Sequence, residues 1–151
     1  MPRIVVISGS PSQSAKTSIV AEYMRDLMYG NRWRTNVIKV RDLPPEALMY
    51  TQFDNPAIVS SVENLEQADG VVITTPVYKA SYTGILKAFL DVLPQKILSG
   101  KVVWPIAVGG TLAHLLMLDY ALKSVLFALG AQNVLSGLFL QDTWIGSFLE
   151  R

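Results

Sequence analysis

Cysteine is absent from the 151 residues of this chain, and histidine occurs once, as His114. Without cysteine the chain has no disulfide bond, no thiolate nucleophile and no cysteine-ligated metal site. A lone histidine lacks the partners that a metal centre or a proton relay requires, so we expect no metal site and no side chain acting as acid or base. Neither charge sign is in excess, since 13 Lys and Arg residues face 12 Asp and Glu residues. This balance shows no bias towards nucleic acid or an anionic membrane.

Targeting and membrane segments are also missing. Met1 leads almost directly into a strand-like run, without the architecture of a signal peptide. The longest apolar stretch, residues 102–118, is interrupted by a proline, a glycine pair and the histidine, which predicts a strand, a turn and a helix rather than a membrane span. The length and the 50% hydrophobic content suit one domain over residues 1–151. We therefore expect a single-domain cytoplasmic protein.

The N-terminal segment joins a short apolar run to a glycine turn and a hydroxyl-rich helix start. Residues 4–7 have no polar face, which is typical of a parallel strand covered on both sides. Gly9 lets the backbone turn tightly. Apolar positions at helical spacing predict a helix over residues 15–29, with residues 14–18 supplying its cap and first turn. Unpaired amides and the positive end of the helix dipole meet there, which favours a bound phosphate.

This phosphate signal belongs to neither of two common nucleotide motifs. Neither G-x-x-x-x-G-K-[ST] nor G-x-G-x-x-G is present, which argues against a P-loop nucleotidase and a dinucleotide-type Rossmann site. The alternative interpretation is that the serines and threonines are only helix caps.

Strands and helices alternate along the rest of the chain. Apolar and alternating runs predict strands over residues 33–40, 71–75, 102–108 and 134–140. Helical spacing predicts helices over residues 57–67, 83–93 and 112–129, with a long loop or short irregular helix over residues 46–56. Pro105, inside the fourth strand, indicates a local irregularity or an incompletely paired position. The last residues, 141–151, leave room for a turn or two of helix at most.

This alternation indicates an α/β fold with a five-stranded parallel sheet between two helix layers. In the flavodoxin-like strand order 2-1-3-4-5, the exits at Gly9, Pro76 and Gly109 meet at one crevice, where ligands of such folds bind. A loop that suits phosphate, a loop with an aromatic side chain (Tyr78) and a loop of paired glycines together suit a flat ring with one phosphate, such as FMN. Glycines allow the ring to approach the backbone.

The predicted helix over residues 112–129 is apolar nearly all round. One sheet face cannot cover all of that surface, so we expect another subunit to cover the remainder.

Several blocks of the sequence resemble one family. They are Gly9-Ser10-Pro11, Ala68-Asp69-Gly70, Thr75-Pro76-Val77-Tyr78-Lys79-Ala80, Leu98-Ser99-Gly100-Lys101-Val102-Val103, Gly109-Gly110-Thr111-Leu112-Ala113-His114-Leu115-Leu116 and Asp119-Tyr120-Ala121-Leu122-Lys123. The chain is similar in these blocks to the NAD(P)H-dependent FMN reductases, and most of all to the reductase component of two-component alkanesulfonate monooxygenase systems.

The resemblance implies both a reaction and a set of site residues. A hydride passes from NAD(P)H to FMN, with NADPH favoured over NADH, and reduced FMN then supplies a partner monooxygenase that releases sulfite from organosulfonates. The cofactors carry this chemistry, and backbone amides near Gly109 to Thr111 are expected to stabilise the flavin ring. The residues implied at the FMN phosphate are Ser10, Lys16, Thr17 and Ser18. Those implied at the ring are Pro76, Val77, Tyr78, Lys79, Gly109, Gly110 and Thr111.

Three features set expectations about this chain within the family. The family often has an arginine soon after the Gly-Ser-Pro turn, where this chain has Ser12, so Lys16 is expected to be the only nearby cation. The family continues into a final helix that packs on the sheet, whereas this sequence ends at Arg151, so an uncovered face is expected to favour oligomers or instability. Tyr120 matches a tyrosine associated with a π-helical widening at a tetramer interface, and we expect such a turn and a homodimer or homotetramer.

Other functional classes share this fold. A flavodoxin-type electron carrier would not bind NAD(P)H, but such carriers are expected to be acidic. A quinone or azo-dye reductase would retain FMN and reduce a second substrate in the same pocket. A non-catalytic interaction module would use the apolar helix as a partner surface, but would leave the three convergent loops unexplained.

Overall fold

The computed structural model describes residues 1–149, and side chains through residue 145. The main strands are β1 (Arg3–Ser8), β2 (Arg34–Lys39), β3 (Gly70–Pro76) and β4 (Val102–Gly109), with the short strands β5 (Asn133–Val134) and β6 (Leu138–Gln141). The α-helices are α1 (Lys16–Gly30), α2 (Pro45–Met49), α3 (Pro56–Glu66), α4 (Gly84–Asp91), α5 (Lys123–Ala128) and α6 (Asp142–Leu149). Shorter helical turns are the 3-10 turns η1 (Val40–Asp42) and η2 (Leu112–His114) and the π-helical turn η3 (Leu118–Leu122).

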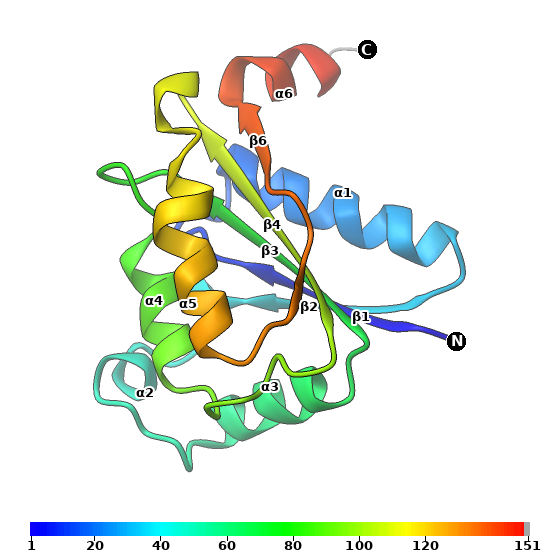
Figure 1. Ribbon diagram of the computed structural model, residues 1–151, viewed down its shortest axis with the longest axis vertical. Helices are drawn as coiled ribbons and strands as arrows, with labels where there is room; N and C mark the ends of the chain where they lie inside the picture. Colours follow the sequence, from blue (N-terminus) through cyan, green and yellow to red (C-terminus); the bar gives the residue numbers. More distant parts are fainter. Residues whose placement is uncertain (150–151) are drawn as a thin grey trace.

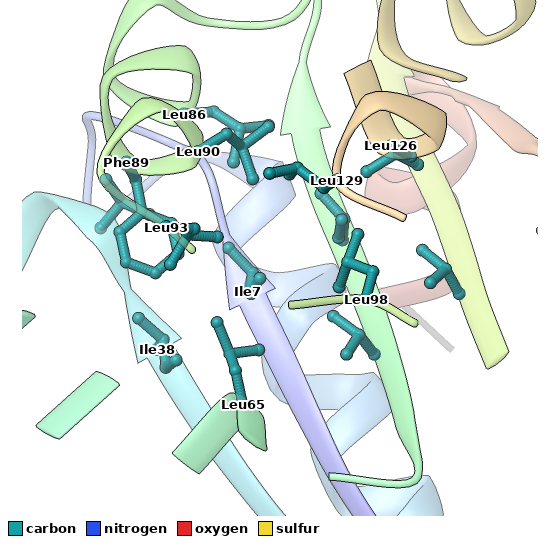
Figure 2. Packing of buried hydrophobic residues seen from close by; sticks show 14 of the residues in the cluster. Ile7, Ile38, Leu65, Leu86, Phe89, Leu90, Leu93, Leu98, Leu126 and Leu129 are labelled. Atoms are coloured by element: carbon teal, nitrogen blue, oxygen red, sulfur yellow. The ribbon is translucent and has the colours of Figure 1, made fainter. Parts of the chain in front are cut away.

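The strands form one parallel sheet in the order β2-β1-β3-β4-β5, which confirms the predicted fold. In Figure 1, α1 lies on one face of the sheet, and α3, α4 and α5 lie on the other. Successive side chains of β1 lie on opposite faces of the sheet. Val5 and Ile7 pack with the α3–α4–α5 layer, and Val6 packs with α1. Figure 2 shows Ile7 and Ile38 of the sheet facing Leu86, Phe89 and Leu90 of α4.

The predicted fifth strand is two strands rather than one. β5 pairs with the start of β4 and β6 with its end, so residues 104 and 105 of β4 have no strand partner on that side. Pro105, which has no amide hydrogen to donate, occupies this gap, as expected of an incompletely paired position. Between β5 and β6, Gly137 packs so closely on Leu118 that a Cβ would lie 2.9 Å from Leu118 Cδ1. The contact with Leu118 thus accompanies the break, which local sequence pattern did not predict.

The expected helix over residues 112–129 is also divided. A 3-10 turn, a π-helical turn and the short helix α5 follow one another, and Tyr120 is at the centre of the π-helical turn. The prediction of one continuous α-helix was therefore wrong, while the π-helical turn is confirmed. Leu118, Leu122 and Leu126 are buried. Large apolar side chains on the other side are exposed: Leu112, Leu115, Leu116, Tyr120 and Phe127.

The α1 face of the sheet is only partly covered in the described part of the chain. An apolar groove of about 340 Å³ lies between α1, the edge of the sheet and α6. Its lining residues are Ile19, Val20, Tyr23, Met24, Ile106, Leu138, Leu140, Trp144 and Ile145. The α6 helix has about the length that was expected after the last strand, although residues 150 and 151 lie outside the described residues. Among the described helices, none is long and apolar enough to cross a membrane.

Candidate active site

Three strand exits meet at the carboxyl edge of the sheet, as predicted from the strand order. The amide of Gly9, which follows β1, donates to the Thr74 carbonyl of β3 at 2.8 Å. The amide of Val77, which follows β3, donates to the Val108 carbonyl of β4 at 3.1 Å. Because each exit is bonded to the neighbouring strand, the loops that begin at Gly9, Val77 and Gly110 are held next to one another (Figure 1).

Gly9 is required at the first exit for steric reasons. A Cβ there would lie 2.9 Å from the Thr74 carbonyl oxygen and 3.1 Å from Leu86 Cβ. The buried hydroxyl of Thr83 donates to the Gly9 carbonyl at 2.6 Å and also accepts from the Leu86 amide at the start of α4. The turn after β1 is therefore fixed from two sides, by β3 and by α4.

The serine hydroxyls after Gly9 build the loop itself. Ser10 is buried, and its Oγ donates to the Ser12 carbonyl at 3.0 Å and accepts from the Ser12 amide at 3.1 Å. Ser18 Oγ donates to the same carbonyl at 2.9 Å. These contacts fold residues 10–12 back against the first turn of α1, so Ser10 and Ser18 define the shape of the loop.

The cap of α1 differs from the prediction. Residues 14–18 were expected to include a side-chain cap, but the cap position is Ala15, which has no side chain able to accept a hydrogen bond. The amides of Lys16 and Thr17 have no hydrogen-bond partner within the described chain. Thr17 is buried, and its hydroxyl likewise makes no hydrogen bond there. The interpretation of these hydroxyls as mere caps is thus wrong, and two amides at the positive end of α1 are available to an anion.

A cation that the sequence reasoning missed lies at this loop. Arg41, in η1 after β2, donates from Nε to the Pro11 carbonyl at 3.2 Å. The prediction that Lys16, which is exposed, is the only cation near the turn was therefore wrong. The signal that could have revealed Arg41 was the strand order, because the exit of a strand beside β1 must lie beside the Gly9 turn.

The loop after β3 contains a tight reversal. The amide and carbonyl groups of Tyr78 and Ser81 bond reciprocally, at 2.9 and 3.1 Å. The two residues between them, Lys79 and Ala80, have φ values of +50° and +62°. Such left-handed conformations are disfavoured for residues with a Cβ, so the backbone of this loop is strained. The sequence does not indicate this strain, because neither position is a glycine. Tyr78 is 48% exposed at the base of the reversal.

The two glycines after β4 have different surroundings. A Cβ on Gly109 would lie 2.7 Å from Phe139 Cζ, so this glycine is needed for packing. A Cβ on Gly110 would meet nothing closer than Asp142 Oδ2 at 4.0 Å, and this residue is exposed. Thr111 Oγ1 accepts from the Ala113 amide at 3.2 Å and caps η2. Gly110 thus offers open backbone to a ligand, whereas Gly109 and Thr111 hold the loop in place.

The arrangement fits a ligand with one phosphate and one flat ring. Two free amides and the cations Lys16 and Arg41 suit the phosphate, and the open backbone at Gly110 beside the Tyr78 loop suits a ring. Among the described residues there is no cluster of three His, Asp or Glu side chains that could hold a metal ion.

Comparisons with known proteins agree with this description. The chain is 45% identical over 149 residues to an FMN reductase (NADPH) of Escherichia coli K12, an alignment that covers 99% of this chain and 78% of that protein. It is 32% identical over 149 residues to an NADPH azoreductase of a Bacillus species, with 95% and 82% covered. Among solved structures, the apo form of an NADH:FMN oxidoreductase superposes with a TM-score of 0.90 at 40% identity, covering 99% of this chain and 84% of that one.

A family model gives the same assignment. The model described as NADPH-dependent FMN reductase matches residues 2–145, which include all three loops of the site. The chain therefore belongs to the NADPH-dependent FMN reductase family and is an oxidoreductase that uses FMN and NADPH.

Proposed function

We propose that this chain is a cytoplasmic reductase that passes a hydride from NADPH, in preference to NADH, to FMN held at the carboxyl edge of the sheet. The observation that carries the proposal is the junction of the three exits, in which Gly9 is bonded to both Thr74 and Thr83 and Val77 to Val108. The junction supports the proposal because it keeps the loop proposed for the phosphate and the loops proposed for the ring at one edge of the sheet, within reach of one FMN molecule.

The proposed contacts divide into two groups. The phosphate group consists of the amides of Lys16 and Thr17 and the side chains of Ser10, Lys16, Thr17 and Ser18. The ring group consists of Pro76, Val77, Tyr78, Lys79, Gly109, Gly110 and Thr111. When bound, FMN supplies the hydride acceptor, and the chain orients it and stabilises negative charge on its polar edge through amides near Gly110. No side chain is required to move a proton.

We further propose that the reduced FMN is released to a separate monooxygenase that desulfonates organosulfonates for sulfur assimilation. The support for this role is the resemblance of the blocks around Tyr78 and Tyr120 to the reductases of such systems. The π-helical turn at Tyr120 and the exposed apolar residues around it support assembly into a homodimer or homotetramer through this face.

A second candidate function is reduction of an azo dye or quinone by retained FMN. It is favoured by the 32% identity to an NADPH azoreductase over nearly the whole chain. The two candidates differ in whether reduced flavin leaves the protein.

The deciding experiment follows NADPH and NADH oxidation by the purified protein with added FMN, together with cytochrome c reduction by released reduced FMN. The proposed function predicts activity that saturates with added FMN and cytochrome c reduction that keeps pace with NADPH oxidation. Dye reduction that is independent of added FMN would support the second candidate instead. Binding of FMN without oxidation of either nucleotide would contradict both.

A further inference from the structure

We propose that Arg41 binds the phosphate of FMN and reaches it from the exit loop of β2. This inference rests on the proposed function, and it adds a residue from a part of the chain that none of the implied site blocks contains.

The sheet places Arg41 beside residues 10–12, the proposed phosphate loop. The last paired residues of β1 and β2 are Ser8 and Lys39, so the segments that follow them leave the sheet side by side. Arg41 Nε donates to the Pro11 carbonyl at 3.2 Å. Pro11 precedes Ser12, whose carbonyl accepts from the hydroxyls of Ser10 and Ser18. The guanidinium is therefore bonded directly to the loop that surrounds the free amides of α1.

Part of the guanidinium remains available for a ligand. Nη1 lies 3.4 Å from Oδ1 of the neighbouring Asp42, whose side chain is 60% exposed. Such an exposed ion pair is weak and exchanges readily with solvent or with a stronger anion. Nη2 has no hydrogen-bond partner within the described chain. A phosphate dianion competes well for these donors, because a guanidinium fork matches its oxygens.

Arg41 and Lys16 are both exposed, but Arg41 is anchored by its bonds to Pro11 and Asp42. Lys16 is exposed and has no ion-pair partner among the described residues. Lys39 is paired with Glu22 at 3.3 Å. The first turn of α1 contains no acidic residue, so Asp42 is the carboxylate that faces Arg41 closely. Ser12 carries no charge, and Arg41 brings a fixed positive charge to the same loop.

The test compares FMN with riboflavin, which has the same ring and no phosphate, by flavin fluorescence titration of the purified protein. Arg41→Met is expected to weaken FMN binding about tenfold, the loss typical of one charge-assisted hydrogen bond at a partly exposed site. Riboflavin affinity is expected to stay unchanged. Arg41→Lys retains the charge and should lose less FMN affinity than Arg41→Met. The salt dependence of FMN binding should also decrease in Arg41→Met.

The matched control is Arg25→Met, because Arg25 on α1 forms the same kind of pair with its own neighbour, Asp26, at 3.1 Å. This control should change neither affinity. Equal loss of FMN and riboflavin affinity in Arg41→Met, or no loss of either, would overturn the inference. A rise in the KM for NADPH with FMN affinity unchanged would also overturn it, because Arg41 would then serve the dinucleotide. If the unaltered protein binds FMN no more tightly than riboflavin, the phosphate site of the proposed function itself fails.

Discussion

The hydroxyl of Thr83 donates a 2.6 Å hydrogen bond to the carbonyl of Gly9, across 74 residues of sequence. The same oxygen accepts from the Leu86 amide and caps α4. One buried side chain thus joins the start of α4 to the turn after β1, from which the proposed phosphate loop continues.

Thr83→Val is expected to lower the free energy of unfolding by about 1–3 kcal/mol, because both the helix cap and a buried carbonyl lose their partner. Thr83→Ser keeps the hydroxyl and should retain most of the stability. Urea unfolding of the two variants measures the difference. A Thr83→Val protein as stable as Thr83→Ser would show that the bond to Gly9 contributes little.

Gly9→Ala is expected to cost about 1–3 kcal/mol of unfolding free energy, since the new Cβ would lie 2.9 Å from a backbone oxygen of β3 that cannot move independently. FMN affinity should decrease with it. Gly84→Ala is the control, because a Cβ at the first position of α4 meets nothing within 4 Å. That variant should be as stable as the unaltered protein or more stable by up to about 1 kcal/mol. Chemical denaturation of both proteins makes the comparison, and equal losses would contradict the steric argument.

Ala80→Gly is expected to stabilise the protein by up to about 1 kcal/mol. Glycine removes the cost of about 1–2 kcal/mol for a left-handed alanine, and its greater freedom in the unfolded chain offsets part of the gain. Ala128→Gly at the exposed end of α5 should have the opposite effect, because helical glycine is unfavourable. Thermal unfolding measures whether Ala80→Gly raises the melting temperature while Ala128→Gly lowers it. Destabilisation by Ala80→Gly would mean that the turn is not strained.

Lys101→Met is expected to destabilise the protein by about 1–3 kcal/mol at neutral pH. The buried ammonium donates to the Glu66 carbonyl at 3.1 Å and to the Ala68 carbonyl at 2.7 Å, and methionine would leave both without this partner. Equilibrium unfolding in denaturant measures the loss. A variant as stable as the unaltered protein would show that water replaces the ammonium at these carbonyls without cost.

The burial of Lys101 also leads us to expect that its contribution to the free energy of unfolding depends on pH. Burial lowers the pKa of Lys101 below its ordinary value of 10.5. The nearby carboxylates of Asp69 and Glu66 raise this pKa, but by less than burial lowers it. Between the lowered pKa and 10.5 the unfolded chain binds more protons at this site than the folded chain, so its contribution to stability rises with pH there. The stability difference between the unaltered protein and Lys101→Met should therefore grow across that alkaline interval. A difference that stays constant or shrinks would contradict the lowered pKa.

Leu116→Glu is expected to shift the protein towards monomers, because it places a charge among the exposed apolar residues around the π-helical turn, where Leu116 is 57% exposed. Tyr29→Glu, at the exposed end of α1 on the other face of the sheet, should leave assembly unchanged. Sedimentation equilibrium at several protein concentrations measures both. A protein that is already monomeric without substitution would refute the proposed interface.

The buried strands and the crevice were readable from the sequence. β1, β3 and β4 each contain an apolar run that leads to a glycine or a proline at the end of the strand, namely Gly9, Pro76 and Gly109, and parallel strands covered on both faces have such apolar runs. With the strand order that such alternation favours, the meeting of Gly9, Pro76 and Gly109 followed. The π-helical turn at Tyr120 was predictable only through resemblance to a family, since no local periodicity indicates it.

Several features depended on contacts between distant segments. The division of the last strand coincides with the packing of Gly137 on Leu118, and the turn after β1 is held by the bonds of Gly9 to Thr74 and Thr83. The helix and strand propensities of neighbouring residues contain no information about such contacts. It also favoured a hydroxyl cap for α1, whereas the serines are bonded within the loop.

The sequence by itself therefore determined the strand and helix pattern, because apolar periodicity and turn residues act locally. The alternation of strands and helices then favoured the strand order that places the exits of β1, β3 and β4 at one edge of the sheet. Only the tertiary structure decided which groups surround the phosphate loop. Arg41 lies 30 residues from Pro11 in the chain, and the pairing of β1 with β2 brings the two together.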